Sequence, residues 1–259
     1  MVYLGIDIGS SATKAVVIDE TGAMWAAAAI PLGAGTAGVS QVMAALEAQG
    51  VKESSLGGVV ATGYGRKRFS QAGKQVSEIS CHAKGARRLC PQVRTVIDVG
   101  GQDSKVIRLD ANGLVEQFVM NDKCAAGTGR FLDMMAHVMG LSLEEMSSLS
   151  LEAKEAAPIS STCAVFAESE VISQLAEGKE MADVLAGVNV SVARRVAGLA
   201  MRLGVRHPVV MTGGVAVHPG VVAALEEELG CALIIPPQPQ LVGALGAALF
   251  ALEADGNRN

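Results

Sequence analysis

The sequence predicts an α/β fold built from two related halves. Three observations lead to this prediction: an internal repeat, short β-branched runs that alternate with longer helical segments, and a length of 259 residues. Such a length provides for one large or two small hydrophobic cores. We expect the halves to comprise residues 1–94 and 95–259. The period of the repeat is too long for a solenoid.

The repeat aligns the segment that starts at Asp7 with the segment that starts at Asp98. DIGSSATK in the first copy falls on DVGGQDSK in the second, and an aspartate and a glycine further along match as well. Each copy reads as an apolar strand, a polar glycine-rich turn and a second apolar strand. The second strands are too short and too rich in β-branched residues for helices, so both copies predict β-hairpins.

Apolar spacing and helix breakers place the remaining elements. Gly50 and Pro91 are expected to end the first two helices. Strands that alternate with helices indicate an α/β architecture. The expected helices lie at 40–49, 77–89, after Cys124, after Cys163 and at 182–203, and the further strands lie at 58–61 and 208–211.

Two Asp-x-Gly hairpins in duplicated halves are suited to binding a polyphosphate. Glycines let backbone N–H groups approach the phosphates closely. Asp7 and Asp98 end their strands and are expected to face a cleft and hold Mg²⁺ through water. Either Asp103 or Gln102 is expected to orient the attacking water. The other expected phosphate contacts come from both turns and the residues after them: Gly9, Ser10, Ser11, Thr13, Lys14, Gly100, Gly101, Ser104 and Lys105.

A third glycine turn supports the nucleotide cleft. One Asp-x-Gly turn alone is most often only a tight hairpin, but two copies and a third turn in the right order favour a ligand site. Gly243 fits the start of a closely packed helix near the hinge. Neither GxGxxG after a strand nor GxxxxGK[ST] is present. The third turn is expected to pass beneath an adenosine and comprises Thr212, Gly213, Gly214 and Val215.

As a set, these segments resemble the signature segments of the actin, hexokinase and Hsp70 superfamily of ATPases (ASKHA), over nearly the whole chain. The resemblance implies two RNase-H-like domains that close around ATP or ADP and Mg²⁺. The superfamily includes sugar kinases, chaperones and filament proteins, so the fold by itself does not decide the function.

Two cysteines lie near expected helix starts. Cys124 precedes a glycine-rich stretch that runs into a helix. Cys163 begins a helix that is expected to end near residue 176, with Ser161 or Thr162 as its N-cap. Positive helix ends favour thiolate and offset the charge of a reduced iron–sulfur cluster. The residues of the glycine-rich stretch that are expected to touch phosphate are Gly127, Thr128 and Gly129.

The count of thiols points to two chains. Two thiolates do not fill the four positions of a [4Fe–4S] cluster, but a two-fold dimer supplies four. From spacing alone, two cysteines thirty-nine residues apart (163 minus 124) are more often ordinary buried thiols. The remaining cysteines and the four histidines show no ligand spacing and are interpreted as structural.

The segments around Cys124 and Cys163 resemble those of the activators of 2-hydroxyacyl-CoA dehydratases and of benzoyl-CoA reductase ATPase subunits, the BadF/BadG/BcrA/BcrD ATPase family. Residues 61–66, ATGYGR, and 78–86, EISCHAKGA, are similar as well. The resemblance implies a homodimeric ATPase with one [4Fe–4S] cluster held by both cysteines of each chain. It implies reduction by a ferredoxin or flavodoxin, and electron donation to a 2-hydroxyacyl-CoA dehydratase or a related iron–sulfur reductase.

Composition removes some classes of protein. A net charge of -5 and 3% aromatic residues argue against a nucleic-acid binder. The longest apolar run, near 241–252, is shorter than the roughly 20 residues of a membrane span. With no visible targeting segment, we expect a cytoplasmic protein.

Two alternatives of the same fold remain. A small-molecule kinase, for example of a sugar, explains the phosphate loops but gives the paired cysteines no role. A filament former or a nucleotide-gated scaffold is the other alternative.

Overall fold

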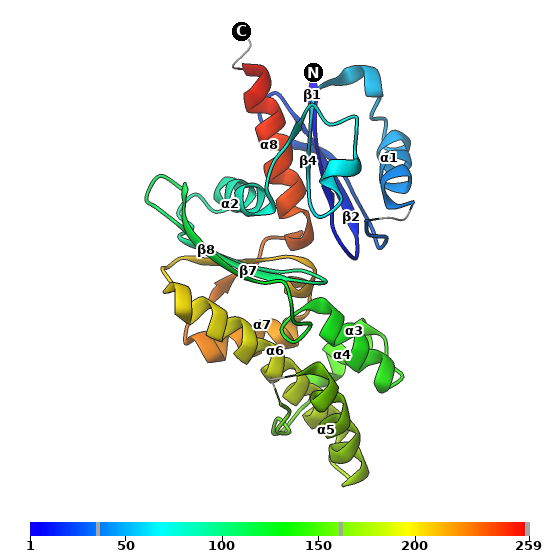
Figure 1. Ribbon diagram of the computed structural model, residues 1–259, viewed down its shortest axis with the longest axis vertical. Helices are drawn as coiled ribbons and strands as arrows, with labels where there is room; N and C mark the ends of the chain where they lie inside the picture. The colour runs from blue at the N-terminus through cyan, green and yellow to red at the C-terminus, as the bar shows by residue number, and fades with distance from the viewer. Residues whose placement is uncertain (35–36, 161–162, 257–259) are drawn as a thin grey trace.

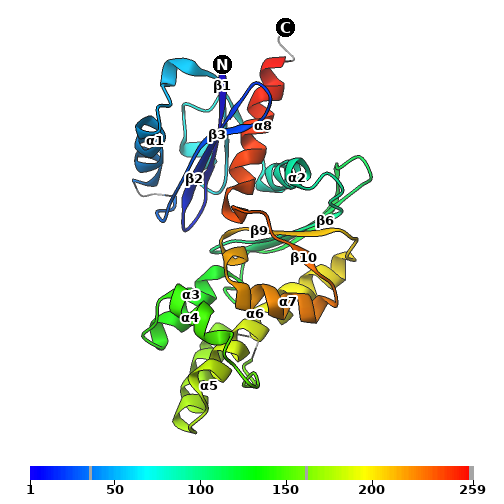
Figure 2. The same ribbon diagram turned by 180° about the vertical axis from the view of Figure 1, so that it is seen from behind.

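The computed structural model describes residues 1–34, 37–160 and 163–256, and it confirms the α/β fold. Two five-stranded sheets, one in each half, lie one above the other in Figure 1, with helices around them. Both chain ends lie at the same end of the molecule, and the view from behind in Figure 2 shows the same arrangement.

The first sheet has the first repeat hairpin at its centre. Its strand order is β3-β2-β1-β4-β5. β1 pairs antiparallel with β2 and parallel with β4. The strands are β1 (Val2–Ile8), β2 (Thr13–Asp19), β3 (Met24–Ile30), β4 (Leu56–Thr62) and β5 (Lys74–Gln75).

The second sheet repeats this topology strand for strand, in the order β8-β7-β6-β9-β10. β6 pairs antiparallel with β7 and parallel with β9. The duplication therefore covers the whole sheet and not only the hairpin that the sequence revealed. The strands are β6 (Thr95–Val99), β7 (Ser104–Leu109), β8 (Val115–Asn121), β9 (Val209–Thr212) and β10 (Leu233–Ile234).

The helices begin and end where local chemistry favours it. The Ser77 side chain accepts a hydrogen bond from the Ser80 N–H at 3.2 Å and caps α2, whose last turn is basic. α7 begins with Pro219, and Gly230, which has left-handed φ, caps its C-terminal end. The α-helices are α1 (Gly38–Ala48), α2 (Glu78–Leu89), α3 (Gly129–Val138), α4 (Leu143–Ser150), α5 (Ala164–Ala176), α6 (Met181–Leu203), α7 (Pro219–Leu229) and α8 (Val242–Gly256).

The division expected at residue 95 separates the two sheets but not the helices that cover them. α8, expected in the second half, packs on the first sheet, where Leu245 and Ala248 share a core cluster with Val16. A Cβ at Gly5 would lie 2.0 Å from the Ala244 carbonyl oxygen, so strand and helix backbones touch. α2, expected in the first half, joins a core cluster that contains strands of the second sheet. The last helix of each expected half, α2 or α8, therefore packs against the sheet of the other half.

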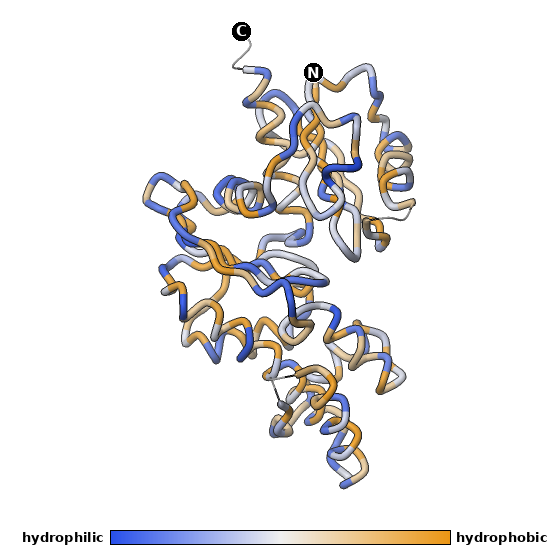
Figure 3. The backbone as a smooth tube through the Cα atoms, in the orientation of Figure 1, coloured by the Kyte–Doolittle hydropathy of each residue, from blue (hydrophilic) through white to orange (hydrophobic). Residues whose placement is uncertain are grey.

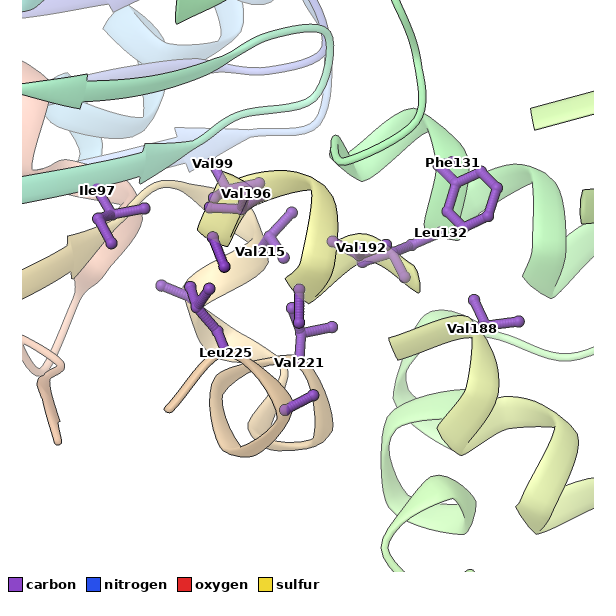
Figure 4. Packing of buried hydrophobic residues seen from close by; sticks show 14 of the residues in the cluster. Ile97, Val99, Phe131, Leu132, Val188, Val192, Val196, Val215, Val221 and Leu225 are labelled. Atoms are coloured by element: carbon purple, nitrogen blue, oxygen red, sulfur yellow. The ribbon is translucent and has the colours of Figure 1, made fainter. Parts of the chain in front are cut away.

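The largest core cluster lies in the second half, between β6, β9 and the helices α3, α6 and α7 (Figure 4). The turn between β7 and β8 is hydrophilic in Figure 3. α6 is long and apolar enough to cross a membrane, but 67% of its most apolar window is buried inside the protein. That burial is typical of the central helix of a folded domain.

An insertion separates the third strand of the second sheet from its first covering helix. It holds α3, α4 and α5 and occupies the end of the molecule away from the chain termini (Figure 1). Cys124 lies at the start of this insertion and Cys163 lies immediately before α5. The expected N-caps Ser161 and Thr162 lie outside the described residues, and Cys163 itself is the N-cap of α5.

Candidate functional site

A cleft of about 660 Å³ lies between the two halves, at the turns of the two repeat hairpins. This volume is within the usual range for small-molecule and cofactor sites. The turns touch each other, since a Cβ at Gly101 would lie 2.2 Å from Ser11 Oγ. The phosphate-type residues of both copies therefore line one cavity.

The aspartate and the lysine of each repeat occupy equivalent positions in the two sheets. Asp7 pairs across the hairpin with Lys14, and Asp98 pairs with Lys105. On the other side of each aspartate, the parallel strand ends in a Thr-Gly pair, 62–63 in the first half and 212–213 in the second. Both glycines have positive φ, and a Cβ on either would lie within 3 Å of the aspartate Oδ1. Glycine is thus required at both positions.

In the first half, the lysine has a single carboxylate partner among the described residues. Lys14 Nζ lies 3.1 Å from Asp7 Oδ2, and its side chain is 18% exposed. Burial by itself would lower the pKa of Lys14, but the charge and hydrogen bond of Asp7 raise it above its ordinary value. The ammonium group is therefore charged and faces the cleft.

In the second half, the lysine is enclosed by three carboxylates. Lys105 Nζ lies 2.7 Å from Asp103, 3.0 Å from Glu78 and 3.3 Å from Asp98, and only 3% of its side chain is exposed. Burial opposes its charge, but the three carboxylates together raise the pKa of Lys105 above its ordinary value. The cation is thus fixed between α2 and the hairpin.

Asp98 is the most densely contacted carboxylate of the cleft. Its Oδ1 accepts a hydrogen bond from Thr212 Oγ1 at 3.1 Å and lies 3.4 Å from His82 Nδ1. Burial alone would raise the pKa of Asp98, but His82, Lys105 and Thr212 lower it. Asp98 is therefore an ionised group held in one orientation.

One carboxylate oxygen in the cleft is left without a partner. Asp103 Oδ1 accepts from Lys105, whereas the buried Oδ2 has no hydrogen-bond partner in the part of the chain that the structure describes. Buried polar atoms are rarely unpaired in proteins. The orphan oxygen therefore fits a water molecule, either free or bound to Mg²⁺.

The far end of the cleft is more apolar and is formed by the insertion and the segment after β9. Leu132, Leu143 and Val217 line it together with Asp133 and His218. Burial raises the pKa of Asp133, which His218 and Arg130 partly offset, and burial lowers the pKa of His218. An apolar wall beside the phosphate-type turns suits the base and sugar of a nucleotide.

Most of the residues expected at the site do line the cleft. Of the four candidate catalytic residues, Asp7, Asp98 and Asp103 line the cleft, and Gln102 does not. The other expected residues that line it are Gly9, Ser10, Ser11, Lys14, Gly100, Gly101, Lys105, Gly129, Gly213, Gly214 and Val215.

Several expected contacts are directed elsewhere. The hydroxyls of Thr13 and Ser104, expected to reach phosphate, donate to the Leu32 and Gly127 carbonyls instead. Thr128 donates to the Ala125 carbonyl at 2.7 Å. Thr212 acts through Asp98, and Gly243 packs beside the His82 ring, with a Cβ expected 2.8 Å from Nε2. Gly127 has positive φ and packs beside α6.

Sequence reasoning missed Glu78 as a group of the cleft and interpreted His82 as a packing residue. Both line the cavity. A signal existed, because residues four apart lie on one face of a helix, and the predicted helix at 77–89 contains both. Asp133 and His218 have no such signal, since only the tertiary fold brings them to the cleft.

The two candidate cluster ligands are partly exposed free thiols. The sequence placed Cys124 at a helix start, but α3 begins at Gly129 and its N-cap is Thr128. Cys124 lies in the preceding loop, where Asn121 Nδ2 donates a hydrogen bond to the Cys124 carbonyl at 2.9 Å. The expected contribution of a helix end thus applies to Cys163 alone. No group of three or more His, Cys, Asp or Glu side chains that could hold a metal occurs in residues 1–34, 37–160 and 163–256.

Cys81 differs from these two thiols. It is fully buried, and burial raises its pKa to about 12. Cys81 is therefore a structural thiol, in agreement with the expectation from its sequence position.

Comparison with known structures assigns the fold to a class. The chain resembles actin- and hexokinase-like ATPases: a ROK family glucokinase from Streptomyces griseus, solved with glucose and AMPPNP, aligns over 98% of this chain and 100% of its own, with a TM-score of 0.58 and 14% identity. At this identity the likeness shows the fold alone. The class is the actin- and hexokinase-like fold, in which two duplicated halves enclose a cleft.

The family follows from stronger matches. Residues 4–251 match the BadF/BadG/BcrA/BcrD ATPase family, and the chain belongs to it. The chain is 53% identical to the activator of lactoyl-CoA dehydratase from Anaerotignum propionicum, over 98% of both chains. The activator of the 2-hydroxyisocaproyl-CoA dehydratase from Clostridium difficile, solved with bound ADPNP, superposes with a TM-score of 0.97 at 48% identity, covering 100% of this chain and 97% of that one.

Proposed function

We propose that this chain is an ATP-dependent one-electron donor that activates a 2-hydroxyacyl-CoA dehydratase or a related iron–sulfur reductase. The observation that supports this most directly is the combination of an ATPase cleft with two partly exposed thiols on the adjacent insertion. Relatives at about half identity are named as dehydratase activators. A sugar kinase has no comparable support, because its likeness to this chain is limited to the fold.

In the cleft, each group has a distinct task in ATP hydrolysis. The backbone of the turns at 9–11 and 100–101 binds phosphate, and Lys14 neutralises its charge. Asp7 and Asp98 would hold Mg²⁺ through water, and the ion would neutralise phosphate charge when bound. The free oxygen of Asp103 orients the attacking water. The apolar far end excludes solvent around the nucleoside.

The thiols fit a cluster only when two chains combine. A [4Fe–4S] cluster needs four thiolates, and one chain offers Cys124 and Cys163. Their partial exposure allows both to reach a second copy across a two-fold axis. We infer a cytoplasmic homodimer that holds one cluster, which supplies one-electron chemistry when bound. A ferredoxin or flavodoxin is the proposed electron source.

The insertion provides a physical link between the two sites. Leu132 of α3 and Leu143 of α4 line the cleft, and Gly129 N–H donates to the Gly100 carbonyl at 2.8 Å. The loop that carries Cys124 leads directly into Gly129. Movement of the second turn on nucleotide binding therefore displaces the segment that carries a thiol ligand.

The test is anaerobic purification of the wild type and of Cys124→Ala and Cys163→Ala. The wild type is expected to be brown, to contain about four iron atoms per dimer, and to reduce a purified dehydratase only with ATP. Each variant is expected to lose iron and electron transfer. Cys231→Ala, a partly buried thiol outside these segments, is the matched control and is expected to keep both. A colourless wild type after reconstitution with iron and sulfide contradicts the proposal.

A further inference from the structure

A groove of about 370 Å³ lies where the end of β8 meets the outer face of α6. It is separate from the nucleotide cleft, and no residue lines both. Its polar lining is dominated by three arginines of α6. The residues that line it on α6 are Arg194, Arg195, Gly198, Leu199 and Arg202.

The arginines concentrate positive charge on a chain of net charge -5. Arg195 and Arg202 are seven residues apart, which places them on one face of the helix two turns from each other. Arg194 is paired with Glu228 at 2.9 Å, but neither Arg195 nor Arg202 forms an ion pair with another described residue. Both residues are exposed and line the groove, so each brings a positive charge to it without an ion-pair partner among the described residues.

A glycine in the groove has no packing reason within the chain. Gly198 lies between the arginines, deep inside the 23-residue helix α6. A Cβ built on it meets no described atom within 4 Å, apart from its two chain neighbours and the backbone of the adjacent helical turns. A helix with glycine in its interior is less stable than the same helix with alanine, so folding alone would favour alanine at position 198. An open glycine in a charged groove suits close approach by a second molecule.

The groove is continuous with the segment that carries Cys124. Asn121 lines the groove, and its Nδ2 donates to the carbonyls of Cys124 at 2.9 Å and Ala126 at 3.2 Å. On the other side, the stem of Arg195 packs against Gly127, where a Cβ would lie 2.7 Å from the arginine Cγ. A molecule bound in the groove therefore lies beside this thiol.

We propose that the arginine groove is the docking surface for an acidic protein, and that this protein is the electron carrier. The inference rests on the proposed function only in identifying the acidic partner as a carrier. Opposite charges speed encounter and fix orientation, which suits a transient partner. The carrier loses one electron and the acceptor on this chain gains it, with no bond made or broken and no proton transferred.

The test measures binding of the iron-free chain to an acidic [4Fe–4S] ferredoxin by biolayer interferometry, across a range of NaCl concentrations. Wild-type affinity is expected to fall steeply as salt rises. Arg195→Gln combined with Arg202→Gln is expected to weaken binding at low salt by about tenfold and to flatten the salt dependence. Lys67→Gln combined with Arg68→Gln, which removes two exposed cations of the first half, is the matched charge control and is expected to leave binding unchanged.

Gly198→Ala separates a loss of binding from a loss of folding, because the variant is expected to be more stable than the wild type. The variant is expected to melt at a higher temperature than the wild type, because alanine favours the helix, and yet to bind the ferredoxin several-fold more weakly. Equal binding by the wild type and the double arginine variant at low salt overturns the proposal. It is also overturned if the arginine changes alter dimerisation, measured by sedimentation, while ferredoxin binding is unchanged, since the groove is then an interface between copies.

The failure of this inference is distinguishable from failure of the proposed function. Binding by the iron-free chain does not depend on the cluster. Iron content and ATP hydrolysis of the wild type test the proposed function separately, and both groove variants, the double arginine variant and Gly198→Ala, are expected to retain iron and ATP hydrolysis.

Discussion

The two repeat hairpins share strands, register and an Asp–Lys pair, yet their lysines have different surroundings. Lys14 contacts one carboxylate and is 18% exposed, whereas Lys105 contacts three and is 3% exposed. Two changes explain the difference. The position of Ala12 in the first copy is occupied by Asp103 in the second, and α2 brings Glu78 to the second copy.

The comparison shows that a duplicated motif does not fix its chemistry. The sequence assigned both lysines to phosphate, because the same residues stand at the same places. In the folded chain, Lys105 balances three buried carboxylates, and Lys14 is the cation with the simpler environment. We therefore interpret the first hairpin as the one that supplies positive charge, and the second as the one that supplies carboxylates.

The largest expected effect is on folding and comes from removing the enclosed cation. Lys105→Met removes the one cation that contacts all three of these carboxylates, and it is expected to lower the free energy of unfolding by about 3–5 kcal/mol. Lys14→Met leaves one carboxylate without its partner and is expected to cost less, about 1–3 kcal/mol. Urea unfolding of both variants measures the difference. Equal losses would show that the two lysines have equivalent roles.

The next effect is on catalysis and tests the residue that distinguishes the second hairpin. Asp103→Ala removes the orphan carboxylate oxygen and is expected to reduce kcat for ATP hydrolysis about a hundredfold, with little change in KM. Gln102→Ala is the control, since Gln102 does not line the cleft. If Gln102→Ala has the larger effect on kcat, the assignment of the water-orienting group to Asp103 is wrong.

A smaller effect is expected in the pH dependence of stability. Burial raises the pKa of Glu78, so the unfolded chain loses this proton at lower pH than the folded chain. The folded state is therefore favoured below the ordinary glutamate pKa, about 4.3, and this contribution is lost as pH rises through the raised value. Relative to wild type, Glu78→Gln is expected to gain stability from pH 4 to neutrality, measured as the free energy of urea unfolding.

Asp98 is expected to change stability with pH in the opposite direction to Glu78, in the same urea-unfolding experiment. Its pKa is lowered, so its contribution is present above the ordinary aspartate pKa and is lost as pH falls through the lowered value. Asp98→Asn is therefore expected to lose stability relative to wild type as the pH rises from acid. A pH-independent difference for both variants would show that these carboxylates do not titrate with folding.

The sequence was informative where residues repeat locally. Asp7 and Asp98, with their lysines and turns, could be aligned because each hairpin is one continuous segment. The Thr-Gly pairs at 62–63 and 212–213 are equally symmetric in space, but they follow strands of different sequence, and the first pair was not recognised as part of the repeat.

The contacts that could not be predicted from the sequence are made by helices that pack against the sheet of the other half. Glu78 meets Lys105 because α2 packs against the second sheet, and a local pattern does not reveal that packing. The thiol segments show a related limit. The glycine-rich stretch after Cys124 suggested an immediate helix, but the chain first makes a turn in which Thr128 donates to Ala125, and α3 starts after it.

Native mass spectrometry under anoxia tests the central claim, that two chains share one inorganic centre. The reconstituted protein is expected to appear as a dimer that carries a single cluster of about four iron and four sulfide ions, and chains separated in the gas phase should retain no complete cluster. A complete cluster on a single chain, or an iron-free dimer that still donates electrons to a dehydratase, would contradict the account.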